Sequence, residues 1–246
     1  MHDRCHPARS VALSLALALW CLAPSAFADL DISILVEQQQ ARAAGRTASP
    51  GAADQRAAGA GGADGPTDPE SQYQLAVSMD AESANPDLKQ AARWYRAAAD
   101  QGHAVSQANL GLMYAQGQGI ARDDRQAIKW LTRAGQQGHT IAQYSLGLMH
   151  YEGRGVRKSF ERALGWYERA ARGGSAKAMN NIGIMNALGE GVGRDDAAAY
   201  AWFAAAAAAG DSGGENNRQL IAQEFDAATR ERAEARAAEL RTELGL

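Results

Sequence analysis

The chain has 246 residues, a formal net charge of −3 and 46% hydrophobic residues. This charge balance gives no reason to propose nucleic acid as a partner, and none is expected. The two cysteines, Cys5 and Cys21, both lie in an N-terminal segment that we expect to be removed. The mature chain is then without disulfides, and packing alone must stabilise it.

Residues 1–28 have the features of a secretory signal peptide. A basic start precedes an apolar run over residues 11–22, and the small-x-small pattern Ala26-Phe27-Ala28 ends the segment. We therefore expect cleavage before Asp29 and an exported, periplasmic protein. The apolar run is about half of the ~20 residues that a membrane-spanning helix needs, and a retained anchor is the alternative.

Two further segments precede the main pattern of the chain. Residues 29–44 carry a few apolar side chains and are expected to form a short helical segment. Residues 45–67 consist mainly of Ala, Gly, Asp, Pro and Ser, which predicts a flexible linker. The two segments together form either a tethered docking peptide or a leader without a role of its own.

From residue 68 onward the sequence repeats itself with a step of 36 residues. The step is shown by the tryptophans Trp94, Trp130, Trp166 and Trp202 and by the glycines Gly111, Gly147 and Gly183. A fixed period of this size predicts a solenoid, in which each unit buries its apolar face against its neighbours. We expect the tryptophans in the core and these glycines at close helix–helix contacts.

The predicted repeats are residues 68–102, 103–138, 139–174 and 175–210, followed by C-terminal capping helices over 211–246. Each repeat divides into a first helix, a Gly-x-Gly turn and a second helix that ends at a glycine. The turn glycines are expected to adopt positive φ angles and not to bind phosphate, because no Gly-Lys-Ser/Thr follows them. The predicted class is an all-α solenoid of about four helix-turn-helix repeats with a capping helix pair.

Residues 142–156 and 163–171 resemble the Sel-one-like repeat family, a relative of the tetratricopeptide repeat. The matching pattern is Leu-Gly-x-x-Tyr, then Gly-x-Gly-Val, then Ala-x-x-Trp-Tyr-x-x-Ala-Ala, with His150 and Asn186 where the family prefers Tyr. The resemblance implies a right-handed superhelix whose concave face is lined by first helices. It also implies an adaptor or regulatory role, in bacteria often at the cell envelope.

The first helices carry a second stripe of side chains beside the one expected to pack the core. By similarity to tetratricopeptide repeats this stripe faces the groove, and apolar groups with Tyr in a groove indicate a protein-binding surface. The alternative is that tight superhelical curvature buries the stripe. Its predicted members are Ile141, Tyr144, Leu148, Tyr151, Lys177, Asn180 and Ile184.

A second candidate surface is a basic edge in the third repeat. It consists of Arg154, Arg157, Lys158 and Arg162. Together with the aromatic groove it raises the alternative of a glycan- or peptidoglycan-binding envelope protein.

No catalytic, metal or cofactor site is expected. His103 and His139 occupy equivalent positions one repeat apart, so they do not converge as metal ligands must. Some cysteine-rich members of the family are reported to bind or hydrolyse β-lactams, and such an envelope enzyme is an alternative that the lack of paired cysteines disfavours. The sequence therefore predicts a non-enzymatic periplasmic scaffold that holds a partner protein or peptide in its groove.

Overall fold

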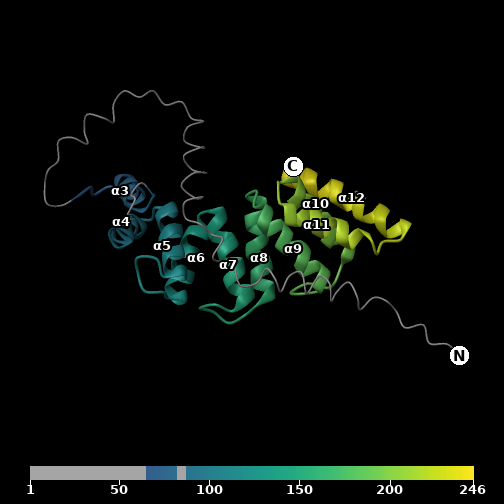
Figure 1. Ribbon diagram of the computed structural model, residues 1–246, viewed down its shortest axis with the longest axis horizontal. Coiled ribbons are helices and arrows are strands. Elements are labelled where there is room, and N and C mark those ends of the chain that lie inside the picture. Colours follow the sequence, from purple (N-terminus) through teal and green to yellow (C-terminus); the bar gives the residue numbers. More distant parts are fainter. Residues whose placement is uncertain (1–64, 82–86) are drawn as a thin grey trace, which may run out of the picture. The chain divides into compact units, whose positions relative to one another are not determined.

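The computed structural model describes residues 65–81 and 87–246, and within these ranges the chain forms helices and turns with no strand (Figure 1). The described chain is thus all-α, as predicted. The predicted signal peptide 1–28, the segment 29–44 and the linker up to residue 64 lie outside the described residues. None of the described helices is long and apolar enough to cross a membrane.

The first two predicted repeats contain helices α3 (Pro69–Ala81), α4 (Leu88–Asp100), α5 (Ala104–Gln116) and α6 (Asp124–Gln136). The next two contain α7 (Thr140–Glu152), α8 (Phe160–Arg172), α9 (Ala176–Leu188) and α10 (Asp196–Ala208). The chain ends with α11 (Ser212–Ala222) and α12 (Ala227–Leu244).

The described residues form two compact units, which meet in the chain within α6, between Trp130 and Leu131. In the first unit α4 packs against both α3 and α5. In the second unit α8 packs against both α7 and α9, and α10 packs against α9, α11 and α12 (Figure 1). Within each unit, therefore, a second helix contacts the first helix of its own repeat and the first helix of the next.

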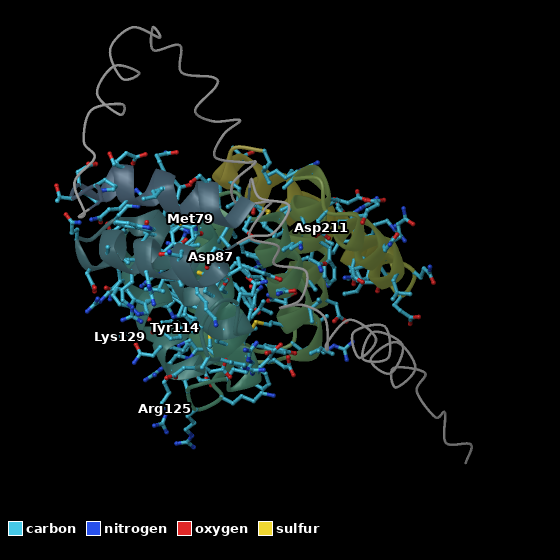
Figure 2. The ribbon with its side chains drawn as sticks, turned by 60° about the vertical axis from the view of Figure 1, so that its left-hand side comes forward. Met79, Asp87, Tyr114, Arg125, Lys129 and Asp211 are labelled. Atoms are coloured by element: carbon cyan, nitrogen blue, oxygen red, sulfur yellow. The ribbon has the colours of Figure 1, made fainter. Side chains whose placement is uncertain are left out.

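Short polar residues set the starts of the helices. Asp87 accepts a hydrogen bond from the Gln90 backbone N–H at 3.0 Å, and Asp211 accepts one from Gly214 at 2.7 Å (Figure 2). Such N-caps satisfy backbone donors that the first turn of a helix leaves without an intrahelical partner. The caps explain why each helix begins where it does.

The turn between the two helices of a repeat depends on glycine. Gly153 ends α7 with φ of +78°, and Gly155 follows with φ of +69°, a region that L side chains rarely adopt. The equivalent Gly191 also lies close to another helix, because a Cβ atom there would be 2.7 Å from the backbone carbon of Phe160. Each of these turn glycines thus permits a backbone conformation, and Gly191 additionally permits a close approach to the start of α8.

The core of the second helices is built around the residue that follows each tryptophan. Tyr95, Tyr167 and Phe203 are at most 1% exposed. Of the four tryptophans of the described repeats, Trp130 is buried, whereas Trp94, Trp166 and Trp202 are half-buried. The expected core position is therefore displaced by one residue in three of the four repeats. A displacement of one residue turns the side chain by about 100° around the helix, which carries the indole toward the edge of the core.

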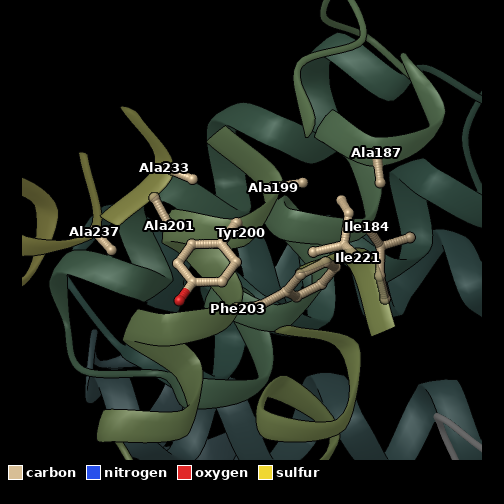
Figure 3. Close-up of a cluster of buried hydrophobic side chains, with 9 residues drawn as sticks. All are labelled: Ile184, Ala187, Ala199, Tyr200, Ala201, Phe203, Ile221, Ala233 and Ala237. Carbon is tan, nitrogen blue, oxygen red and sulfur yellow. The ribbon is translucent and has the colours of Figure 1, made fainter. Parts of the chain in front are cut away.

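The repeating glycines of the first helices face this aromatic core. A Cβ atom on Gly183 would be 2.6 Å from the Phe203 ring, and one on Gly147 would meet the Tyr167 ring in the same way. Figure 3 shows the apolar cluster around Phe203, with Ile184 and Ile221 beside the ring. The missing side chain of glycine thus leaves the space that the aromatic ring of the partner helix occupies.

The last helix covers one side of this cluster. Only Ala233 and Ala237 of α12 are buried, and both belong to the cluster around Phe203 (Figure 3). The rest of α12 is mostly exposed and carries Arg and Glu side chains. A polar terminal helix of this kind shields the apolar end of a repeat array from water.

Candidate functional site

The predicted groove stripe divides into a buried and an accessible part. Tyr144, Leu148 and Ile184 are only 5–8% exposed. The Tyr144 ring packs against the Tyr167 ring, with 5.8 Å between their centroids. These three residues therefore offer little area to a partner, and for them the structure matches the alternative of burial by neighbouring helices.

Ile141, Tyr151, Lys177 and Asn180 form the accessible part of the stripe, with Lys177 exposed and the other three half-buried. Tyr151 binds the following repeat, and Asn180 binds the capping helix α11. The Tyr151 hydroxyl donates to Glu190 at 2.6 Å, and the Asn217 amide donates to Asn180 at 2.9 Å. Two members of the accessible stripe are therefore held in place by hydrogen bonds, one to the next repeat and one to α11, which reduces the entropy lost when a ligand binds.

Tyr151 lies where the groove stripe meets the basic edge. Its ring contacts the Phe160 ring nearly edge-on, with 5.2 Å between centroids. The ammonium of Lys158 lies over both rings, 4.4 Å from the Phe160 centroid and 5.5 Å from the Tyr151 centroid. Burial, followed by the bond to Glu190, raises the pKa of the Tyr151 hydroxyl well above its ordinary value, so it remains a hydrogen-bond donor at neutral pH.

The other members of the basic edge lie close to this aromatic pair in the sequence. Arg157, Lys158 and Arg162 are exposed, and Arg154 is half-buried. Phe160 and Glu190 also contact Tyr151, although neither belongs to the predicted groove stripe or basic edge. A signal for Phe160 exists in the repeat itself, since the equivalent positions 36 residues before and after it are Asp124 and Asp196.

His150 is buried, with 7% of the residue exposed. Its Nδ1 has no hydrogen-bond partner among the described residues. Burial and, secondly, the positive charge of Arg162 lower the pKa of the imidazole below its ordinary value. The neutral form is therefore favoured in the folded protein.

His103 and His139 act as helix caps. The Nδ1 atoms accept from the backbone N–H groups of Ser106 and Ala142, at 3.4 and 3.3 Å. Across residues 65–81 and 87–246, no three His, Cys, Asp or Glu side chains come together as a metal site would require. Cys5 and Cys21 lie outside the described residues.

An open cavity of about 460 Å³ lies between α10, α11 and α12. Arg218 crosses it, donating to both carboxylate oxygens of Glu215 at 2.7 and 2.9 Å and to the Tyr200 hydroxyl at 3.0 Å. The hydrogen bonds to Glu215, first those from Arg218 and then the one from Gln219, lower the pKa of this carboxyl to about 2. Because Arg218 is already bound on these three sides, it serves to join α11 to α10.

The family model described as the Sel1 repeat matches residues 69–103, 104–139, 140–175 and 176–211. Among solved structures, the chain is similar to c5321, a protective antigen of uropathogenic Escherichia coli strains that displays an SLR fold. The two are 31% identical with a TM-score of 0.62, over 70% of this chain and 38% of that one. The chain therefore spans well under half of the length of this relative.

A Sel1 repeat protein from Oxalobacter formigenes is also 31% identical, with a TM-score of 0.60 over 70% of each chain. No curated protein matches the sequence.

Proteins of this repeat class generally serve as scaffolds for protein–protein interaction. The matches confirm the predicted fold class, an all-α solenoid of helix-turn-helix repeats. The four contiguous repeat matches cover more than half of the chain, and on this basis the chain belongs to the Sel1 repeat family.

Proposed function

We propose that this protein is a non-enzymatic scaffold of the bacterial periplasm that holds a partner protein or peptide along its first helices. The observation that carries the proposal is the accessible part of the stripe on α7 and α9. There an aromatic, an amide and a cationic side chain lie on packed helices, and two of them are fixed by hydrogen bonds, one to the next repeat and one to α11. Rigid aromatic and polar groups of this kind are typical of protein-binding surfaces.

The periplasmic location is supported by the N-terminal sequence. A basic start, a short apolar run and the Ala26-Phe27-Ala28 pattern together favour export. Mass spectrometry of the protein purified from the cell envelope should find Asp29 as its first residue.

Site-specific photocrosslinking in intact cells tests the scaffold. A crosslinking amino acid at Ile141 or Lys177 should capture a partner protein, because both side chains belong to the accessible stripe. The matched control carries the same group at Gly165, an exposed position of α8 where an added Cβ meets no atom within 4 Å. Equal capture at all three positions, or capture at none of them, contradicts the proposal.

A further inference from the structure

The loops of successive repeats share one backbone but differ in how their cations are neutralised. In the second, third and fourth repeats, a cation stands two residues before the start of the second helix. These cations are Arg122, Lys158 and Arg194, at positions separated by the repeat step. In the second repeat Arg122 binds Asp124 through two hydrogen bonds, at 2.9 and 3.3 Å. In the fourth repeat Arg194 binds Asp196 in the same way, at 2.9 and 3.0 Å.

The third repeat lacks this internal carboxylate. Phe160 stands where the other repeats have Asp124 and Asp196, and Ser159 stands where they have Asp123 and Asp195. Lys158 consequently lies over the Phe160 ring, and it forms no ion pair with a carboxylate of the described residues. The repeat thus keeps the loop cation but has replaced its anion with an aromatic ring.

Further cations appear in the third repeat at the same end of the helices. Arg157 and Arg162 are exposed, and neither forms an ion pair with a carboxylate in the described part of the chain. Their equivalents in the other repeats are uncharged: Ala121 and Gly193 for Arg157, and Gln126 and Ala198 for Arg162. Glu161, the acid next to Arg162 in the sequence, accepts a hydrogen bond from the Ser159 hydroxyl at 2.9 Å. Positive charge is therefore concentrated on this loop of a chain whose net charge is −3.

We propose that the loop of the third repeat, through Arg157, Lys158 and Arg162, binds an acidic segment of the partner protein, whose carboxylates replace the aspartate that this repeat lacks. The inference rests on the proposed scaffold function and identifies the chemistry of the partner. The second and fourth repeats show that a carboxylate is the group these loop cations bind. The Phe160–Tyr151 pair supplies an adjoining aromatic surface that continues into the groove stripe.

A short acidic peptide fits better than a long polyanion. The cations occupy one loop and the first turn of α8, whereas the rest of the chain carries an excess of acidic residues that would repel an extended anionic polymer. Exposed ion pairs are individually weak and strongly screened by salt. We therefore expect modest affinity for the loop alone, with the groove stripe supplying the remaining contacts of a complete partner.

The test is fluorescence anisotropy on the full chain at low ionic strength, with a short labelled peptide of alternating Glu and Ala. The Glu peptide should bind more tightly than its Gln counterpart. Each of Arg157→Gln, Lys158→Gln and Arg162→Gln should weaken binding by roughly two- to fivefold, the range of single exposed ion pairs. Arg194→Gln is the matched control and should leave binding unchanged, because that guanidinium is already occupied by Asp196.

Two further variants move the carboxylate itself. Phe160→Asp should restore an internal partner for Lys158 and reduce binding of the Glu peptide toward that of the Gln peptide. Asp196→Asn should release Arg194 and strengthen binding of the same probe. Circular dichroism checks that each variant keeps its helices. If Phe160→Asp unfolds, the exposed Lys158→Gln variant still tests the inference.

Each outcome decides between the alternatives. Equal binding of the Glu and Gln peptides, or equal loss in Lys158→Gln and Arg194→Gln, overturns the inference. If an anionic polysaccharide binds more tightly than the Glu peptide and loses affinity in the same variants, the loop is a glycan site and the acidic-segment assignment is wrong. Crosslinking at Lys177 that persists while the peptide fails to bind refutes the inference and leaves the scaffold function standing. Peptide binding at the loop without any crosslinked partner supports the acidic-ligand site and contradicts the scaffold function.

Discussion

At the scale of single residues, the buried imidazole of His150 differs from the side chains at the equivalent positions of the neighbouring repeats. The same position is Tyr114 on α5 and Asn186 on α9. The Asn186 amide donates to the Ile182 carbonyl at 2.8 Å, whereas Nδ1 of His150 has no such partner among the described residues. A titratable group buried without a hydrogen bond at one nitrogen is held in its neutral form at a cost that depends on pH.

We expect the stability of the protein to fall as the pH is lowered below about 6.5, the ordinary value for histidine. The pKa of His150 is lower in the folded than in the unfolded chain, so in this window the unfolded state binds a proton that the folded state does not. His150→Asn should make the pH dependence of the thermal midpoint shallower. Arg162→Gln, which removes the second cause of the shift, should flatten it less, and an unchanged slope in His150→Asn would contradict the assignment.

At the scale of helices, the contact between α7 and α8 depends on a position without a side chain. Gly147 lies against the Tyr167 ring, which is buried and whose hydroxyl also shares a hydrogen bond with Asn181 of the next repeat. One aromatic side chain thus contributes both to the packing within a repeat and to the bond between repeats. Any atom added at Gly147 displaces that ring.

Two glycine substitutions in this helix pair should have opposite effects. Gly147→Ala should destabilise the protein by roughly 1–3 kcal/mol, the usual cost of overpacking a core. Gly165→Ala should stabilise it by about 0.5–1 kcal/mol, because this exposed helical position is open space and alanine restricts the unfolded chain. Chemical denaturation of both variants measures the pair, and a stable Gly147→Ala variant would show that α7 and α8 pack less closely than described.

The sequence predicts the helix pairs well because their signal lies within one period. Caps, turn glycines and apolar spacing are all local, and residues 211–246, expected to be helical, contain α11 and α12. The sequence predicts poorly which residues of the groove stripe are accessible. Tyr151 binds Glu190 and Asn180 binds Asn217, contacts that join residues about one repeat apart. Contacts between neighbouring elements determine how accessible these side chains are. The residue pattern along a single helix does not show such contacts.

At the scale of the whole molecule, stability should depend on the end of the array. In a repeat protein each unit is stabilised mainly by its neighbours, so an uncovered terminal unit loosens first. Here α12 packs against α10 and covers the cluster around Phe203 with Ala233 and Ala237. The polar composition of the outer side of α12 keeps the covered end soluble.

Truncation after Asp226 tests this role of α12. We expect a loss on the order of 2 kcal/mol or more from the apolar area exposed, with the fastest amide hydrogen exchange appearing in α9, α10 and α11. Removal of Leu246 alone, whose side chain is 45% exposed, is the matched control and should have no measurable effect. Unaltered exchange in α10 after the larger truncation would show that α12 is dispensable.

The near identity of the three turn backbones has a consequence for how such proteins diversify. The paired φ angles are +75° and +67°, +78° and +69°, and +74° and +72°. The conformation is therefore set by glycine, while the intervening and following side chains are free to vary between repeats. New recognition chemistry then requires only two or three substitutions in one loop, without any redesign of the helices. Binding specificity can therefore evolve in the loop of one repeat while the loops of the other repeats stay unchanged.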